Sequence, residues 1–443
     1  MRRFEFKDAR SYKFWEIQVE GNAFTVRYGK VGTDGVTQTK SYANADKAKA
    51  EAEKKIREKT NKGYAEVASA PVSTPAAATS PDDDWAVLAD KLQAAGDPWG
   101  ERIAVFRQWD EAKGKAKAPF KKRLNQLDEE HGEHFYGAAL LALMAEENFE
   151  KTARLKWDSG YIVEARVGAT DYDHEGPDPG EVMAALMKSP AVAHLRKLTL
   201  GLPAYDDTNF GGYIRSIAAT KLEKLDYLFI GDFEYPEQTE LSWAVVGDVD
   251  KLLPAVPNLR TLRVRGAAIG FASLEHPKLQ RLEIETGGLP RESIAGIAAA
   301  KAPELAHLEV WFGRRDYGGS DDITALDALW ANPNLPQLKH LGLQNAEMQD
   351  EIAAALANSK ILAQVESVDM SMGTMHEPGA RAILAAADSF KHLKSLNLED
   401  NFITGSEYSQ LHTAFGSRVN LRSQRGPDDW GDGVPRYYTA VGE

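Results

Sequence analysis

The most regular pattern of apolar positions along the chain is the template LxxLxL, with aliphatic residues at its first, fourth and sixth positions. Successive copies begin 30, 34, 20, 26, 33, 27 and 28 residues apart. The copies are LRKLTL at 195, LDYLFI at 225, LRTLRV at 259, LQRLEI at 279, LAHLEV at 305, LKHLGL at 338, VESVDM at 365 and LKSLNL at 393. A template that recurs at such periods indicates a repeat architecture.

Each copy predicts a short strand with an apolar inner face. Between the copies lie segments typical of helices, namely ESIAGIAAA, DEIAAALANS and PGARAILAAADS. A single strand and helix cannot bury its own apolar face, so the units are expected to stack into a curved α/β solenoid of leucine-rich repeats. We assign the solenoid to residues 149–423. The hairpin ARLKWDSGYIVEARVG should cap its N-terminal end, and residues 424–443 form a C-terminal cap or tail.

A different period marks the N-terminal end of the chain. Apolar and polar residues alternate from Phe14 to Val26, which predicts an antiparallel meander that turns at EGN and GTDG. A helix is expected to follow, with Asn44 as its N-cap and Gly63 at its end. The predicted fold of residues 1–67 is therefore α+β. Residues 68–83 are rich in alanine, proline, serine and threonine and predict a flexible linker.

Residues 84–148 show apolar residues at helical spacing, starting with Trp85, Leu88 and Leu92, and GDPWG separates the first two expected helices. This stretch predicts a small helical block that accompanies the repeats.

Composition adds a contrast in charge. The 443 residues carry a formal net charge of −13, with 43% hydrophobic and 27% charged residues, as in a soluble globular protein. Residues 1–67 hold 15 Lys and Arg against 10 Asp and Glu, or +5, which leaves −18 for the remainder. A basic module is thus joined to an acidic body. The sequence has no cysteine, no signal-peptide pattern and no long apolar run, so we expect a cytoplasmic protein without disulfides or thiolate chemistry.

The exposed positions of the template, which are its third and fifth residues and the residue after it, indicate a protein interface. Aromatic residues at Tyr227, Phe229 and Trp311 flank an arginine cluster formed by Arg263, Arg265 and Arg281. Aromatic and arginine residues are common anchors of protein interfaces. The alternative is that cross-strand Arg–Glu pairs neutralise an ordinary solvated face.

Known catalytic motifs are absent. The chain has no P-loop, HExxH, GxSxG or dinucleotide-binding GxGxxG pattern, so we expect no enzyme activity and no cofactor. His131 and His134 of EEHGEH could share one helix face, but Gly132 disfavours that helix and no third ligand is evident, so no metal is predicted. The polar stretches 171–181 and 314–322 are expected to be solvated loops.

The stretch KFWEIQVEGNAFTVRYGKVGTDGVTQTKSY, with the helix and KGY after it, resembles the WGR domain of poly(ADP-ribose) polymerases and many bacterial proteins. Tyr28, Gly29 and Lys30 stand where the family has its Trp-Gly-Arg motif. The resemblance implies DNA contact at this turn, with the aromatic ring on a nucleotide and the cation on phosphate. The nucleic-acid-binding residues it implies are Tyr28, Gly29 and Lys30. The basic residues around the same turn add Arg27 and Lys40 to the expected site. The ammonium group of lysine at position 30 cannot make the bidentate hydrogen bonds to phosphate that the guanidinium of arginine makes.

Two further resemblances cover other parts of the chain. WAVLADKLQAAGDPWGERIAVFRQW is similar to a helical segment found beside bacterial repeats. IETGGLP, LGLQNAEMQDEIAAAL and RYYTAVGE resemble bacterial leucine-rich repeat proteins that often carry a WGR domain, some of them called molybdate metabolism regulators.

Two functional hypotheses follow. In the first, the protein is a non-catalytic adaptor whose WGR-like domain binds nucleic-acid ends or breaks while the concave repeat face binds a protein. In the alternative, it is a scaffold that binds proteins alone. Neither hypothesis involves a membrane.

Overall fold

The computed structural model describes residues 2–8, 11–30, 36–42, 44–60, 62, 64–67, 85–170, 174–204 and 208–442. The chain divides into two compact units, Met1–Asp84 and Trp85–Glu443, each of which is considered by itself. The linker predicted at 68–83, the GTDG turn and the helix stop at Gly63 lie outside the described residues.

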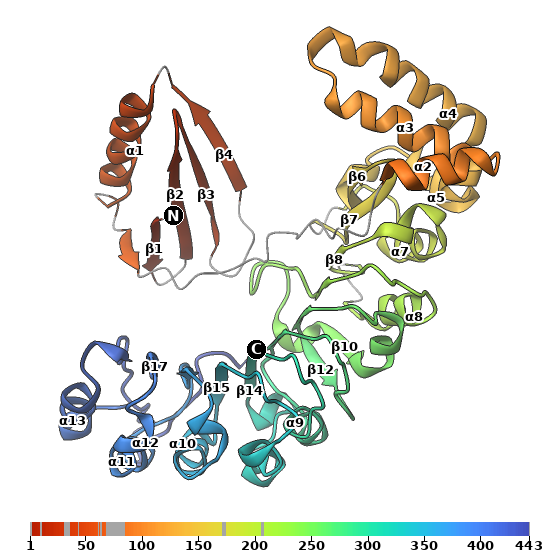
Figure 1. Ribbon diagram of the computed structural model, residues 1–443. Helices are drawn as coiled ribbons and strands as arrows, with labels where there is room; N and C mark the ends of the chain where they lie inside the picture. Colours follow the sequence, from red (N-terminus) through yellow and green to blue (C-terminus); the bar gives the residue numbers. More distant parts are fainter. Residues whose placement is uncertain are drawn as a thin grey trace. The chain divides into compact units, whose positions relative to one another are not determined.

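The N-terminal unit is a five-stranded antiparallel sheet with one helix against it (Figure 1). Its strand order is β4-β3-β2-β1-β5, so β2, β3 and β4 form the predicted meander, and β1 and β5, which the pattern did not predict, extend the sheet beyond β2. The elements are β1 Arg2–Asp8, β2 Ser11–Glu20, β3 Ala23–Lys30, β4 Val36–Ser41, α1 Ala45–Thr60 and β5 Ala65–Val67.

Alternation along the strands builds the core of this unit. Trp15 and Ile17 of β2 are buried in one cluster with Phe24 of β3 and with Ala52 and Ile56 of α1. These residues lie on the face of the sheet that the helix covers, because side chains two apart on a strand share a face.

The predicted N-cap of α1 is confirmed. The backbone N–H of Lys47 donates to Oδ1 of Asn44 over 2.9 Å. A side-chain acceptor at this position satisfies one of the donors that a helix start leaves without an intrahelical partner.

The second unit is built on an eleven-stranded sheet in the order β18-β17-β16-β15-β14-β13-β11-β9-β8-β7-β6. Its strands are β6 Ala153–Asp158, β7 Tyr161–Val167, β8 Lys197–Leu200, β9 Tyr227–Ile230, β11 Thr261–Arg265, β13 Arg281–Glu285, β14 His307–Gly313, β15 His340–Ala346, β16 Ser367–Asp369, β17 Ser395–Asn397 and β18 Val419–Asn420. A separate parallel pair is formed by β10 Val245–Asp248 and β12 Ala267–Gly270.

Helices precede and alternate with these strands. The first group is α2 Trp85–Ala94, α3 Pro98–Glu111, α4 Ala118–Tyr136, α5 Ala138–Met144 and α6 Phe149–Thr152, and it packs into the same core as the sheet. The second group is α7 Pro179–Lys188, α8 Gly211–Ala218, α9 Arg291–Ala298, α10 Gln349–Ala357, α11 Glu377–Ala385, α12 Ala387–Phe390 and α13 Gly405–Phe415. Figure 1 shows the long helices of this second group side by side along one side of the row of strands.

All eight copies of LxxLxL form adjacent parallel strands of this sheet. The fourth residue of each copy pairs with the fourth residue of the next, so that one column of aliphatic side chains crosses the sheet. The column is Leu198, Leu228, Leu262, Leu282, Leu308, Leu341, Val368 and Leu396, each at most 1% exposed. The predicted hairpin is present as the antiparallel pair of β6 and β7 at the N-terminal edge.

The last residues of the chain return to the carboxyl ends of the later strands. The side chain of Asn345, at the end of β15, bonds the backbone N–H and C=O of Val441 over 2.9 and 2.7 Å. The backbone N–H of Ala440 donates to the carbonyl of Met372 over 2.9 Å. Residues 440–441 are thereby fastened to two successive repeats.

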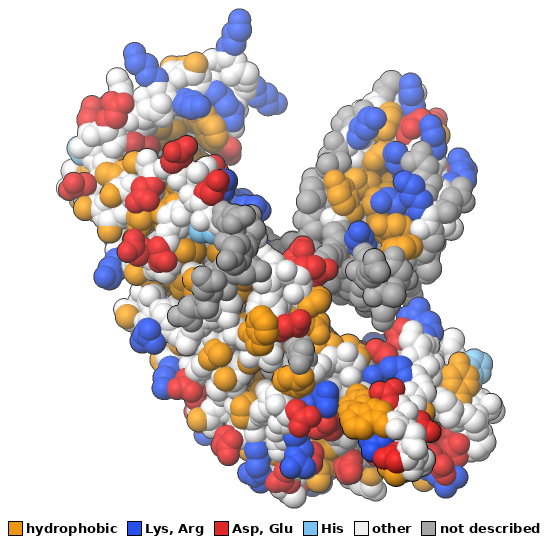
Figure 2. Space-filling view, turned by 180° about the vertical axis from the view of Figure 1, so that it is seen from behind, with side chains coloured by type: hydrophobic (Ala, Val, Ile, Leu, Met, Phe, Trp, Pro, Cys, Tyr) orange, Lys and Arg blue, Asp and Glu red, His pale blue; other side chains and the backbone are white. Residues whose placement is uncertain are grey.

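Charged side chains of both signs are scattered over the face of the second unit seen in Figure 2. Within the parts of the chain that the structure describes, no helix has both the length and the apolar character needed to cross a lipid bilayer.

The aliphatic column predicts where the second unit is most sensitive to truncation. Leu341 lies on β15 between two paired strands and has no solvent exposure, so Leu341→Ala should lower the free energy of unfolding by about 2–5 kcal/mol. Val87 on α2 is 62% exposed, and Val87→Ala should change it by less than about 0.5 kcal/mol. Urea unfolding of the full chain, followed by circular dichroism, measures both. Equal effects would contradict the packing described.

Candidate functional site

In the N-terminal unit, Arg27 is held by an ion pair within the domain. Its Nε donates to Oε2 of Glu16 over 2.7 Å, and Nη1 of Arg3 donates to Oε1 of the same carboxylate over 2.9 Å. Glu16 is only 3% exposed. Both guanidinium groups also lie over the ring of Phe14, at 5.2 Å for Arg27 and 4.7 Å for Arg3. The guanidinium of Arg27 is thus held within the domain, where it shares one carboxylate with Arg3.

Tyr28 and Lys40 lie on the other face of the sheet. Tyr28 is directly opposite Trp15 on β2, and Lys40 is opposite Phe24 on β3. Directly opposed residues share a face, so both belong to the face covered by α1. Tyr28 is partly buried against that core, and Nζ of Lys40 is 5.6 Å from the ring centroid of Tyr42.

The five nucleic-acid-binding residues expected from sequence are therefore not brought onto one surface. Arg27 faces one side of the sheet and Tyr28 the other. Gly29 and Lys30 end β3, and Lys30 is directly opposite Lys13 on β2. The side chain of Lys30 lies outside the described residues.

A lysine cluster that sequence reasoning missed lies at the end of α1 next to this position. It consists of Lys13, Lys55, Lys59 and Lys62. Burial lowers the pKa of Lys59, and the charges of Lys62, Lys55 and Lys13 lower it further. Nζ of Lys59 lies 4.7 Å from the ring centroid of Tyr64 and 5.7 Å from that of Trp15.

Bringing like charges together costs free energy, and such arrangements are concentrated at functional sites. The spacing of Lys55 and Lys59, one helical turn apart and just before Lys62, was the available signal in the sequence. In Figure 2, Lys and Arg side chains of this unit surround a group of apolar ones on the visible face.

On the second unit, the predicted arginine cluster is part of an Arg–Glu network on three strands. Arg263 binds Oε2 of Glu283 over 2.5 Å and Oε1 of Glu285 over 3.0 Å. Arg265 donates from Nε to Oε2 of Glu285 over 2.7 Å, and Arg281 binds Glu283. Burial alone would raise the pKa of Glu285. The positive charges of Arg265 and Arg263 outweigh the effect of burial, so the pKa of Glu285 is lowered. Cross-strand Arg–Glu pairs are present, as the alternative expected, but three arginines share two glutamates in this network.

The prediction that Phe229 is an exposed aromatic anchor is wrong. Phe229 is 5% exposed, because the guanidinium of Arg263 lies 4.5 Å from its ring centroid and that of Arg265 lies at 5.7 Å. Tyr227 is partly buried, and Nζ of Lys197 lies 4.8 Å from its ring centroid. Trp311 is partly exposed, and its Nε1 donates to Oε1 of Gln344 over 3.0 Å.

Beside this network, His307, Glu309 and His340 form a second polar group. Nε2 of His307 is 2.9 Å from Oε2 of Glu309, and the two imidazole rings stack with centroids 4.1 Å apart. Among the described residues, these three form the group of potential metal ligands, with ligand atoms within 4.8 Å of one another. The histidines noted in the sequence lie elsewhere: Nε2 of His134 is 3.0 Å from Oδ1 of Asp97.

Burial controls the protonation of the two stacked histidines. It lowers the pKa of His307 to about 3, with a further contribution from Arg281. It also lowers the pKa of His340 to about 4, with the nearby His307 acting in the same direction. Both rings are therefore neutral at physiological pH, and the pKa of Glu309 is raised, mainly by burial and then by Asp369.

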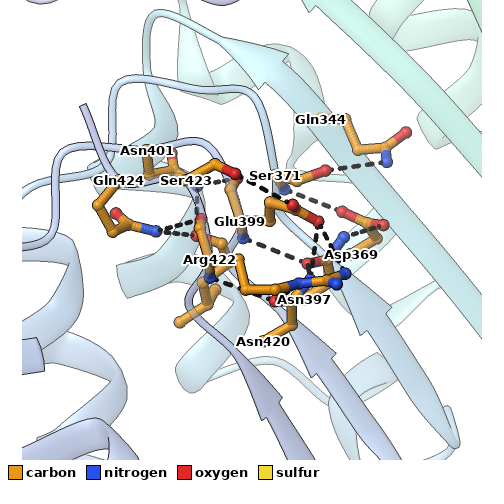
Figure 3. A network of polar contacts seen from close by, with 11 residues as sticks. Gln344, Asp369, Ser371, Asn397, Glu399, Asn401, Asn420, Arg422, Ser423 and Gln424 are labelled. Carbon is orange, nitrogen blue, oxygen red and sulfur yellow. Dashed lines mark hydrogen bonds and ion pairs between the residues drawn. The ribbon is translucent and has the colours of Figure 1, made fainter. Parts of the chain in front are cut away.

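The polar face continues over the last strands as a chain of amides and carboxylates (Figure 3). Nδ2 of Asn397 donates to Oδ2 of Asp369 over 2.7 Å, and Nδ2 of Asn420 donates to Oδ1 of Asn397 over 2.8 Å. Asn420 also donates to Oε2 of Glu399 over 2.9 Å. Residues at equivalent template positions thus bond from strand to strand.

Comparison with known proteins shows which family the N-terminal unit resembles. Residues 1–71 match the WGR domain family. Two Escherichia coli K12 proteins are similar in this region: the uncharacterized protein YfeS, 46% identical over 65 residues, and the protein YehF, 43% identical over 68 residues. Each match covers 15% of this chain and 27% or 25% of the relative, so the chain spans about a quarter of their length.

Similarity to solved structures extends further. A crystal structure of a Bacteroides fragilis protein, from the Northeast Structural Genomics Consortium, matches 100% of this chain and 99% of its own, with a TM-score of 0.54 and 25% identity. A Listeria monocytogenes internalin covers 66% of this chain with a TM-score of 0.28 and 12% identity, too low to support a conclusion.

The chain is thus a mixed α/β protein that begins with a WGR domain.

The Arg–Glu network predicts a difference between two glutamates. Glu285 holds two arginines and its side chain is 16% exposed, so Glu285→Gln leaves buried positive charge behind and should cost about 3–5 kcal/mol of unfolding free energy. Glu275 pairs with Lys301 at 60% exposure, and Glu275→Gln should cost at most about 1 kcal/mol. Urea unfolding of both variants measures this, and equal losses would contradict the buried network.

The stacked histidines predict a pH dependence. In the unfolded chain both should take up protons near pH 6.5, whereas the folded chain should not do so until about pH 4 for His340 and about pH 3 for His307. The free energy of unfolding should therefore fall as pH drops below about 6.5. Above that pH the pair should cause no further change of this free energy with pH. NMR titration of the full chain, with His307→Gln and His340→Gln used for assignment, measures both values. Titration of either ring near pH 6.5 would contradict its burial.

Proposed function

We propose that the protein is a non-catalytic adaptor. Its WGR domain binds nucleic acid at ends or breaks, and its second unit is a leucine-rich repeat solenoid whose exposed sheet face binds a protein partner. The observation that carries the proposal is the lysine cluster at the end of α1, within a domain that matches the WGR family.

The lysine cluster suits a phosphate backbone. Lys13, Lys59 and Lys62 bring like charges to one place, which costs free energy that an anion would recover. Tyr64 and Trp15 lie beside Lys59, so apolar rings accompany the cations. Since Lys30 lies opposite Lys13, its position belongs to the same end of the sheet. We place the phosphate contacts here rather than at Arg27, whose guanidinium is bound to Glu16.

The solenoid assignment is supported by the eight template copies, which lie on adjacent parallel strands. On its sheet face, partly exposed side chains alternate with buried ones, as in the partly exposed His307, Glu309 and Trp311 of β14. Rows of partly buried polar and aromatic groups on a rigid sheet are suited to recognising a protein surface.

The protein-only scaffold remains the second candidate. It is favoured by the ion pair of Arg27 and by the packing of Tyr28 against the core. The two candidates differ in whether the N-terminal unit binds nucleic acid at all.

Binding of the full chain to a nicked, 5′-phosphorylated DNA duplex tests the adaptor proposal. Fluorescence anisotropy in a salt series should show saturable binding that weakens with salt, because phosphate contacts release counterions. The double variant Lys59→Gln, Lys62→Gln should lower the log–log salt slope by about 0.9 per lost contact.

The matched control is Lys49→Gln, Lys54→Gln, which removes the same charge from exposed positions of α1 outside the lysine cluster. It should leave most of the salt slope in place. An equal loss in both double variants would reject the lysine cluster as the contact. Absence of saturable binding at low salt would reject the adaptor and favour the protein-only scaffold.

A further inference from the structure

Three adjacent strands place a glycine at the centre of a ring of polar side chains. On the exposed face, His307 of β14 is opposite His340 of β15, and Glu309 is opposite Gly342. Gly342 is in turn opposite Asp369 of β16. Direct opposition on neighbouring strands puts side chains about 5 Å apart. Two imidazoles and two carboxylates therefore surround a position that has no side chain of its own.

Gly342 allows Glu309 to lean across the sheet. A Cβ atom at position 342 would lie 2.8 Å from Cγ of Glu309 and 3.3 Å from its Cα, so any larger residue would displace this side chain. With glycine there, the carboxylate of Glu309 comes within 2.9 Å of Nε2 of His307. All three potential ligand atoms of His307, Glu309 and His340 then lie within 4.8 Å of one another.

The neighbouring polar groups hold the ligands in place. Nδ1 of His340 is 2.8 Å from Oγ of Ser367, which leaves Nε2 as its other ring nitrogen for a second interaction. Hydrogen bonds of this kind orient metal-binding histidines in proteins. Asp369 accepts a hydrogen bond from Asn397 over 2.7 Å. It adds a second carboxylate beside the group.

We propose that His307, Glu309 and His340 form a binding site for a divalent transition-metal ion, with zinc as its best-fitting occupant. Two imidazole nitrogens and one carboxylate oxygen are the protein ligands of many zinc sites that keep one position open. Imidazole disfavours calcium and magnesium, which prefer oxygen ligands. The side chains of His307 and Glu309 are 19% and 27% exposed, so solvent reaches the group.

Metal binding requires one local rearrangement. The two rings are nearly parallel, with an interplanar angle of 12°, whereas a bound ion lies close to the plane of each imidazole that holds it. At least one of the rings must therefore turn out of the stack. The ion would replace the contact between Nε2 of His307 and Glu309. Its open position would then be available to water or to a donor atom of a bound protein.

Calorimetric titration of the full chain with zinc chloride, after treatment with a chelator and dialysis, tests this site. One equivalent should bind at micromolar zinc. Glu309→Gln, which keeps the side-chain shape, and His340→Ala should each weaken binding at least about tenfold. His131→Ala, which removes an exposed histidine of α4, should leave it unchanged. Circular dichroism of each variant verifies that the fold is retained.

Cobalt provides a second readout that does not depend on heat. Cobalt(II) should give the visible absorption of a four-coordinate site in the unaltered protein and lose it in Glu309→Gln. No zinc binding at micromolar concentration would overturn the proposal, as would binding that survives in Glu309→Gln and His340→Ala. None of these outcomes depends on nucleic-acid binding, so the site is tested separately from the adaptor function.

Discussion

The shared register of the parallel strands is the constraint on which the second unit depends. The fourth template residue of each copy pairs with that of the next, and the aliphatic column is buried across the whole sheet. A slip of one residue would turn every buried leucine to solvent. The same register fixes the exposed face, because residues at equivalent positions become neighbours. Arg263 reaches Glu283, and His307 stacks on His340, because the leucines beneath them are aligned.

Much of this architecture could be predicted from the sequence. Alternation and repeat spacing are local properties, so they located the strands, their order and the N-cap at Asn44. The burial of Phe229 could not be predicted, since it depends on how two arginines of the next strand fold over its ring. One error was avoidable. Arg27 and Tyr28 are consecutive residues of a strand, and consecutive strand residues face opposite sides. The lysine cluster was harder to find, because it requires the end of α1 to meet β2.

The two units differ in how their charged side chains are arranged. On the sheet face of the second unit, arginines and glutamates meet in pairs, and their mutual attraction offsets the cost of removing them from water. At the end of α1, four lysines gather, and Lys59 is affected by the other three. In the first arrangement each arginine meets a glutamate, whereas the second brings like charges together.

The bonds between Asn345 and Val441 join residues 96 positions apart, and they enclose the last three strands of the sheet, β16, β17 and β18, in one loop. In a stack of repeats each unit ordinarily contacts only its neighbours, so the terminal units can fray one at a time. Here the end of the chain is tied back to β15. Separation of the end of the chain from β15 must break both of these bonds, so the end of the chain is coupled to a strand that is not its immediate neighbour in the chain.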